Sequence, residues 1–181
     1  MGKFKIKYIL GNARFWIVKV LNLNKIESVG YKYYVGKKVE IALDKKSKLI
    51  INNKLYLSNY TKLQCENGFI SIGYNNFFND YCRIVSLSKI QIGDNNIFGP
   101  NVSIFDHDHK YESNECLICK QGFIKSEVKI GSNVWIGSNV VITKGVTIGN
   151  RVVVGANSIV NKSLDSNALY AGNPIRLIKK I

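Results

Sequence analysis

The chain has 181 residues, of which 46% are hydrophobic and 21% charged, a composition that excludes a disordered protein and suffices for one domain with a sizeable core. Lysine and arginine number 26 against 12 acidic residues, and the net charge of +14 predicts an anionic partner such as nucleic acid, a membrane surface or a polyphosphate ligand. The scattered aromatic residues form no RNA-recognition, zinc-finger or recognition-helix pattern, so we expect no nucleic acid.

Residues 1–45 are basic and free of repeats, and we interpret them as an N-terminal cap segment. Their apolar run, Phe15 to Leu23, contains Lys19 and Asn22 and is too short to span a bilayer. It fits a short helix or a surface in peripheral contact with a membrane, and the helix is favoured. No secretory signal precedes the cysteines, so we expect a cytoplasmic protein, with peripheral contact at the inner face of the membrane permitted by the basic charge.

A six-residue repeat governs residues 46–162. Its clearest phase places an aliphatic side chain at every sixth position, namely Ile130, Ile136, Ile142, Ile148, Val154 and Val160. A second lattice follows four residues after each of these, at Val134, Val140, Val146 and Val152, and ends at Ser158. Six is neither the period of a helix nor the alternation of a plain strand, so it indicates a structural repeat.

The period has a simple geometric explanation. Positions i and i+4 of an extended chain point to the same side, so a chain that turns every six residues buries both lattices. Three sides make a coil of about eighteen residues, and coils stack as parallel strands about 4.8 Å apart. Glycine and asparagine recur where corners need a positive φ or no Cβ: Gly131, Asn133, Gly137, Asn139, Gly149, Asn150, Gly155 and Asn157. A β-sandwich is disfavoured, because its variable turns would not keep one phase.

The same rhythm runs through three earlier phases, separated by slips of three and two residues: Ile51, Leu57, Leu63; Ile72, Phe78, Ile84; and Ile92, Phe98, Ile104. It is lost from Phe105 to Glu127, and we predict a loop over residues 105–129 within the solenoid of residues 46–162. This loop holds both histidines of the chain, and such long polar excursions are typical of working loops. Residues 163–181 are expected to form a C-terminal tail with a basic end.

The cysteine spacing offers little support for a metal site. Cys116 and Cys119 form a lone C-x-x-C without a second pair or a nearby histidine pair, so we interpret them as loop thiols and expect no metal.

Two segments resemble the hexapeptide-repeat acyltransferases: NVWIGSNVVITKGVTIGNRVVVGANSIV, and the ending YAGNPIRLIKK, which is similar to the family terminator A-G-x-P-x-[RK]-x-[IL]. The resemblance covers residues 70–179 and falls in the branch of galactoside, maltose and xenobiotic acetyltransferases and surface-polysaccharide O-acetyltransferases. It implies an all-β fold, a left-handed parallel β-helix with a long catalytic loop and a short N-terminal cap. It also implies acetyl-CoA as co-substrate and a homotrimer with active sites between subunits.

Acetyl transfer to a hydroxyl needs a base for the hydroxyl proton and a donor for the oxyanion. The family's catalytic histidine lies nine residues after the proline of a G/A-P-N-V motif, and GPNV at residues 99–102 places this position at His109. His107 is the alternative base, and Asp106 or Asp108 would orient the imidazole. Lys110 stands where many relatives have proline, so this chain departs from the maltose type.

The resemblance also implies a set of binding residues. Trp135 lies where the family has an aromatic residue near the active site, and a plain packing or corner role is the alternative. The backbone N–H of Ser138 would stabilise the oxyanion. Gly155-Ala156 would hydrogen-bond the pantetheine as an added strand. Three basic residues match positions that meet the CoA phosphates: Lys162, Arg176 and Lys179. Asn79 and Asp80 would contact the acceptor hydroxyls.

We therefore expect an acetyl-CoA-dependent O-acetyltransferase acting on a sugar hydroxyl in surface-polysaccharide biosynthesis (O-antigen or capsule). The alternative is an N-acetyltransferase of an amino-sugar nucleotide, although residues 1–45 hold no G-x-G-x-x-G fingerprint. A zinc carbonic anhydrase on the same helix would need three histidine ligands, and the chain has two. A non-catalytic binding solenoid is a further alternative.

Overall fold

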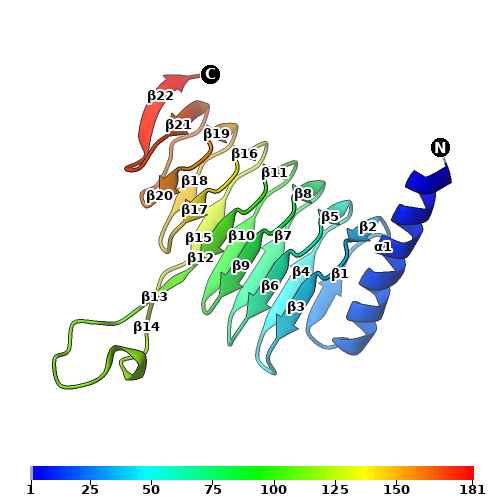
Figure 1. Cartoon of the computed structure of the whole chain (residues 1–181), viewed down its shortest axis with the longest axis horizontal. Coiled ribbons are helices and arrows are strands. Elements are labelled where there is room, and N and C mark those ends of the chain that lie inside the picture. The colour runs from blue at the N-terminus through cyan, green and yellow to red at the C-terminus, as the bar shows by residue number, and fades with distance from the viewer. Residues whose placement is uncertain (1) are drawn as a thin grey trace.

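Three sheets of parallel strands wind into a solenoid of about six turns in the computed structural model, which describes residues 2–181 (Figure 1). Sheet A contains β1 (Ile26–Ser28), β4 (Lys48–Ile51), β7 (Phe69–Ile72), β10 (Lys89–Ile92), β15 (Val128–Ile130) and β18 (Thr147–Ile148). Sheet B contains β2 (Tyr33–Val35), β5 (Leu55–Leu57), β8 (Asn76–Phe78), β11 (Ile97–Phe98), β16 (Trp135–Ile136), β19 (Val152–Val154), β21 (Ala168–Ala171) and β22 (Arg176–Lys180). Sheet C contains β3 (Glu40–Leu43), β6 (Lys62–Cys65), β9 (Arg83–Ser86), β12 (Ser103–Phe105), β17 (Val141–Ile142) and β20 (Ile159–Val160). The predicted fold is confirmed, and the architecture is that expected of a left-handed β-helix.

The predicted aliphatic lattice is the core of the solenoid. Every residue of the four first-lattice phases is buried and at most 4% exposed, and the second lattice from Val134 to Ser158 is equally buried. Phe78 and Phe98 stack inside the core with ring centroids 4.3 Å apart. Coils one to three are longer than eighteen residues because their strands in sheets C and A reach three or four residues, and the fourth coil is lengthened by the loop. The two slips fall between sheets C and A, where these extra residues lie.

Corners repeat the same backbone geometry in coil after coil. Asn133, Asn139 and Asn157 have φ between 56° and 59°, as predicted. Gly137 instead provides close approach, because a Cβ there would lie 2.6 Å from the backbone nitrogen of Ala156. Asn150 differs from the prediction, since Arg151 takes the positive φ of 54°. The Asn150 side chain instead accepts a hydrogen bond from the backbone N–H of Ser132 at 2.8 Å.

The first coil begins at Ile26, so the solenoid starts inside the predicted cap segment of residues 1–45 and not at residue 46. The remainder of that segment contains the helix α1 (Gly2–Leu21), which lies across the N-terminal end of the solenoid (Figure 1). Phe15 of α1 is fully buried and stacks on Tyr33 with ring centroids 3.9 Å apart. Within residues 2–181, no helix combines the length and the apolar character needed to cross a membrane.

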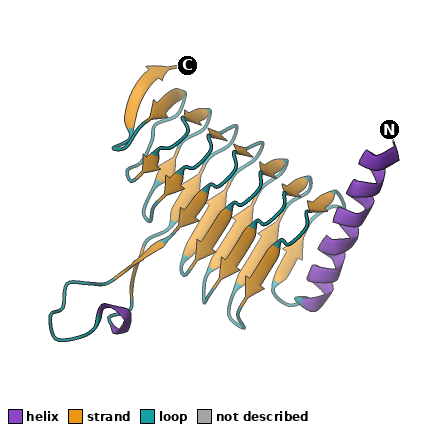
Figure 2. Cartoon of the chain, in the orientation of Figure 1, coloured by secondary structure: helices purple, strands orange, loops and turns teal. Residues whose placement is uncertain are grey.

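Two irregular parts leave the repeat. The predicted loop projects from the body as β13 (His107–His109), the 3-10 helix η1 (Ile118–Lys120) and β14 (Phe123–Lys125), with β13 and β14 antiparallel (Figure 2). At the C-terminus, β21 continues sheet B in parallel and β22 returns antiparallel to it.

Candidate functional site

The residues predicted for the site form two groups on opposite edges of sheet C. We name the turn from a sheet B strand to the next sheet C strand the B–C corner, and the turn from sheet C to sheet A the C–A corner. Ser138 lies in the B–C corner of the fifth coil, and Lys144 lies in its C–A corner. The chain between them crosses sheet C, a distance of about 15 to 20 Å.

The B–C corner gathers four residues predicted to bind CoA. Trp135 points outward from sheet B, is 55% exposed and pairs in register with Val153. Ser138 and Ala156 occupy equivalent places in successive corners, and the N–H of Asn157 donates to the carbonyl of Ser138 at 2.9 Å. Gly155 stands beside Ala156, so this corner presents main chain with small side chains. Such a surface suits an extended partner that hydrogen-bonds to the backbone.

Two of the three predicted phosphate-binding residues extend the same surface. Lys179 is the register partner of Leu169, which in turn pairs with Val153 next to Trp135. Lys179 is therefore three strand spacings from Trp135, or about 14 Å. Arg176 pairs with Ala171, whose Cβ would lie 2.9 Å from a Cβ built on Gly155.

Lys162 lies apart from this surface. It follows β20 and thus lies at the C–A corner of the sixth coil, on the other edge of sheet C from Arg176. One chain does not bring the three basic residues together.

The predicted loop is fixed at its base by a fully buried carboxylate, Asp106. It accepts a hydrogen bond from the Ser86 hydroxyl at 2.6 Å and from the backbone N–H groups of Leu87 and Ser88, each at 2.8 Å. A fourth contact joins Oδ1 to Nδ1 of His107 at 3.1 Å. Because an ionised carboxylate only accepts, Nδ1 carries the proton in this pair and Nε2 of a neutral ring is left as the acceptor.

Both histidines lie on β13 and meet Phe123 of β14. The ring of Phe123 lies 5.4 Å from that of His107 and 4.6 Å from that of His109, measured between centroids. The His107 side chain is 14% exposed, whereas His109 is exposed. Lys144 anchors the intervening Asp108 through an ion pair of 2.6 Å. The loop therefore presents two imidazoles from a tethered strand, and one of them is oriented by a buried carboxylate.

Asn79 and Asp80, predicted to contact the acceptor, occupy the B–C corner of the third coil. Asp80 holds that corner together, because its Oδ1 accepts from the Ser58 hydroxyl and from the backbone N–H of Asn59 at 2.8 Å. The Asn79 side chain accepts from the backbone N–H of Asp80 at 2.8 Å. Both side chains therefore accept hydrogen bonds that hold the backbone of the corners in place.

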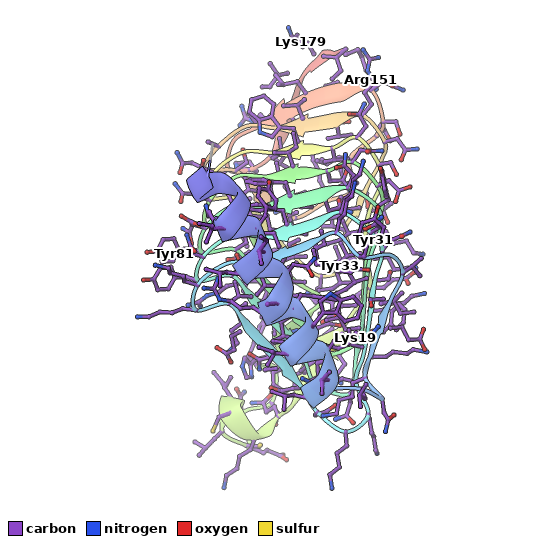
Figure 3. The ribbon with its side chains drawn as sticks, turned by 90° about the vertical axis from the view of Figure 1, so that its right-hand side faces the viewer. Lys19, Tyr31, Tyr33, Tyr81, Arg151 and Lys179 are labelled. Atoms are coloured by element: carbon purple, nitrogen blue, oxygen red, sulfur yellow. The ribbon has the colours of Figure 1, made fainter. Side chains whose placement is uncertain are left out.

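Beside them lies a hollow of about 370 Å³ that is not among the predicted sites, lined by Tyr60, Tyr81, Arg83, Asn101 and Ser103. The two tyrosine rings stack with centroids 4.9 Å apart and are nearly parallel. Tyr81 lies at the outer edge of the molecule in Figure 3. Among the described residues, the Arg83 guanidinium has no ion-pair partner.

The six-residue repeat indicates where this hollow lies. The third residue after each sheet B lattice position forms one row along the B–C corner: Lys38, Tyr60, Tyr81, Asn101, Asn139 and Asn157. All six have a positive φ, between 53° and 64°. Asparagine tolerates this conformation, and tyrosine is uncommon in it, so two tyrosines in the row mark it as specialised.

The exposed thiols of Cys116 and Cys119 lie in the loop near η1. Within residues 2–181, no three His, Cys, Asp or Glu side chains are grouped as a metal ion would require.

Comparisons with known proteins agree with the fold. Residues 127–162 match the family model described as bacterial transferase hexapeptide (six repeats). The chain is 31% identical to a maltose O-acetyltransferase from Clostridium difficile 630, over 96% of this chain and 88% of that one, with a TM-score of 0.60.

Two solved relatives contain the co-substrate or its product. A galactoside acetyltransferase in complex with coenzyme A is 32% identical, with a TM-score of 0.59, over 78% of this chain and 64% of that one. A hexapeptide-repeat acetyltransferase from Vibrio cholerae O1 biovar eltor, complexed with acetyl coenzyme A, is 28% identical, with a TM-score of 0.58, over 81% and 69%.

Proposed function

Because the chain belongs to the hexapeptide-repeat acetyltransferases, with acetyl-CoA as co-substrate, we propose that it acetylates a sugar hydroxyl in surface-polysaccharide biosynthesis, such as that of O-antigen or capsule. The observation that carries this proposal is a histidine-bearing loop on a solenoid whose opposite edge offers a basic, main-chain-lined surface for CoA. Our mechanism is direct attack of the hydroxyl on the thioester, with histidine as the general base.

The active site is proposed to form between subunits of a homotrimer. Within one chain, sheet C separates His107 and His109 from Ser138 and Gly155. A neighbouring copy related by a three-fold axis can bring its loop to this chain's B–C corner, and cyclic symmetry then builds three equal sites.

The reaction needs one proton acceptor and one oxyanion donor. The sugar oxygen attacks the thioester carbonyl carbon while its proton moves to the imidazole, and the CoA thiolate leaves with a proton returned from that ring. The Ser138 N–H would donate to the tetrahedral oxyanion. Motif spacing assigns the base to His109, while the hydrogen bond that His107 Nδ1–H donates to Asp106 supports His107 by leaving its Nε2 as the acceptor.

The acceptor is proposed to occupy the hollow beside Asn79 and Asp80. Stacked tyrosine rings offer a flat apolar platform for a sugar face, and Asn101 and Ser103 supply polar groups. Arg83 adds a cation that suits a carboxylate. The hollow lies on the same B–C edge of sheet C as Ser138, so a neighbouring chain's loop that reaches this edge would meet the acceptor as well as CoA.

The test measures CoA release from acetyl-CoA with maltose, a β-galactoside and polysialic acid as acceptors. His109→Ala, or His107→Ala if that ring is the base, should lower kcat/KM by about 10² to 10⁴ while the variant still binds CoA. Lys110→Ala, an exposed change in the same loop, is the matched control and should retain activity. Full activity in both histidine variants would overturn the assignment.

The same assay separates hydroxyl from amine acceptors. With UDP- and dTDP-linked amino sugars added to the panel, we expect transfer to the hydroxyl acceptors. Transfer to the amino sugars alone would replace the proposal with N-acetylation.

A further inference from the structure

The outward face of α1 is apolar and uncovered. Seven large apolar side chains of this helix each expose between 37% and 77% of their surface: Ile6, Ile9, Leu10, Trp16, Ile17, Val20 and Leu21. At 100° per residue, all seven fall within one side of the helix, and within residues 6–21 the remaining residue on that side is Ala13. In water, such a contiguous apolar face marks a contact surface.

The opposite side of α1 packs on the solenoid, which fixes the direction of the apolar face. Gly11 and Phe15 are buried against the first coil, and the Asn12 amide donates to the carbonyl of Tyr31 at 2.7 Å. Figure 3 shows α1 lying across the end of the solenoid, with Lys19 and Tyr33 nearby. Nothing in residues 2–181 covers the outward face.

Basic residues flank the apolar face, and acidic ones are missing from this part of the sequence. The Lys19 ammonium lies 5.1 Å from the Trp16 ring, and Arg14 lies near the other border. Residues 2–25 contain six Lys or Arg and no Asp or Glu, because the first acidic residue is Glu27. The surroundings of the apolar face are therefore cationic.

We propose that α1 docks this protein on an anionic lipid surface, lying in the plane of the interface. Apolar side chains along the whole side of a helix can all reach the acyl boundary only when its axis is parallel to the membrane. Lysine and arginine at the borders of the face then meet the headgroups, where each basic residue adds attraction to anionic lipid. Trp16, with an apolar ring and a polar N–H, suits that depth.

Charge favours lipid over a second copy as the occupant. Two copies joined through α1 would bring their basic segments together, and like charges across an interface oppose association. Anionic headgroups neutralise the same residues. Docking would hold the N-terminal end of the solenoid at the membrane, where a lipid-linked glycan would be presented; this last consequence alone rests on the proposed function.

The test is flotation of the full-length protein with phosphatidylcholine vesicles, with and without phosphatidylglycerol. The protein should float with the anionic vesicles, bind neutral ones at least about tenfold more weakly, and be released by salt. Ile17→Glu with Val20→Glu should reduce binding to anionic vesicles by at least about tenfold. The matched control is Ile178→Glu, which is similarly exposed on β22 at the far end of the solenoid and should leave binding unchanged.

Two results would overturn the inference. One is failure of the unaltered protein to float with anionic vesicles. The other is a glutamate double variant that floats normally but loses a self-association seen in solution, which would make α1 a protein contact. Acetyl transfer to a soluble acceptor should be unaffected by the double variant, so failure of docking and failure of the proposed activity are distinguishable.

Discussion

The Asp106 side chain fixes the base of the loop that carries His107 and His109. A buried carboxylate is costly unless its lone pairs are used, and Asp106 uses them on three donors of the third C–A corner and on His107. Asp106 is therefore fixed to the preceding coil, and its hydrogen bond with His107 orients the imidazole ring. Asp108, two residues later, makes an exposed ion pair of the kind that contributes at most about 1 kcal/mol.

Cys82 provides a prediction on pH. This thiol lies in the third B–C corner and donates to the carbonyl of Gly99, and burial raises its pKa from 9.0 to about 11. Between these values the unfolded chain has lost the proton and the folded chain keeps it, so the free energy of unfolding falls as pH rises, by about 1.4 kcal/mol per unit. Urea unfolding from pH 8 to pH 11 measures this slope.

The comparison with Cys82→Ala isolates that thiol, because Cys65, Tyr33 and Tyr56, whose pKa values are also raised, remain in both proteins. We expect the alanine variant to lose less stability between pH 9 and pH 11 than the unaltered protein. Equal losses in the two proteins would contradict a buried, protonated thiol at this corner.

The strands whose positions follow from the six-residue repeat could be predicted from the sequence. The features that depend on individual contacts between side chains could not. The lattice from Ile51 to Val160 fixes which residues face inward, since a six-residue period has one geometric solution in a stacked coil. The first coil is hidden in the sequence because Ser28 pairs with Ile51 of the lattice, and Val35 comes seven residues after Ser28. The apolar run from Phe15 to Leu23 predicts only a short helix, whereas α1 begins at Gly2. The Tyr60–Tyr81 hollow depends on stacking between coils, which spacing along the chain does not encode.

The attachment of α1 can be tested through Phe15, the one large side chain among residues 6–21 of the helix that is fully buried. Phe15→Ala removes its stack on Tyr33 and leaves a cavity, at a cost of about 3 to 5 kcal/mol for a site that cannot collapse. Because the parallel strands pair with one another and not with α1, we expect the loss to be local. Hydrogen exchange should show faster exchange in α1 and unchanged protection in β7 to β12.

Ile17→Ala is the matched control, since this side chain is 60% exposed on the same helix and its loss should change stability by less than about 0.5 kcal/mol. Faster exchange throughout the solenoid in Phe15→Ala would instead make α1 part of one cooperative unit with the strands.

At the scale of the whole molecule, the solenoid keeps the two halves of the proposed chemistry apart. The strands of sheet C are rigidly paired from coil to coil, so no bending within one chain brings β13 to the fifth B–C corner. Lys162, on the same edge as the loop, would face a CoA bound on a neighbouring chain together with that chain's Arg176. The proposed site shared by two subunits would account both for the split set of basic residues and for the separation of the histidines from Ser138.

A shared site predicts complementation between two inactive chains. One chain carries His107→Ala and His109→Ala, and the other carries Arg176→Glu and Lys179→Glu, all four at the surface or in the loop. Co-expressed in equal amounts and isolated as mixed trimers, they should regain about one third of the normal activity, since a trimer with both kinds of chain joins an intact loop to an intact corner at one of its three interfaces. Tandem affinity purification through two different tags, followed by the CoA-release assay, measures the mixed trimers. Each variant expressed alone is the control, and a mixture as inactive as its parents would require both groups to act within one chain.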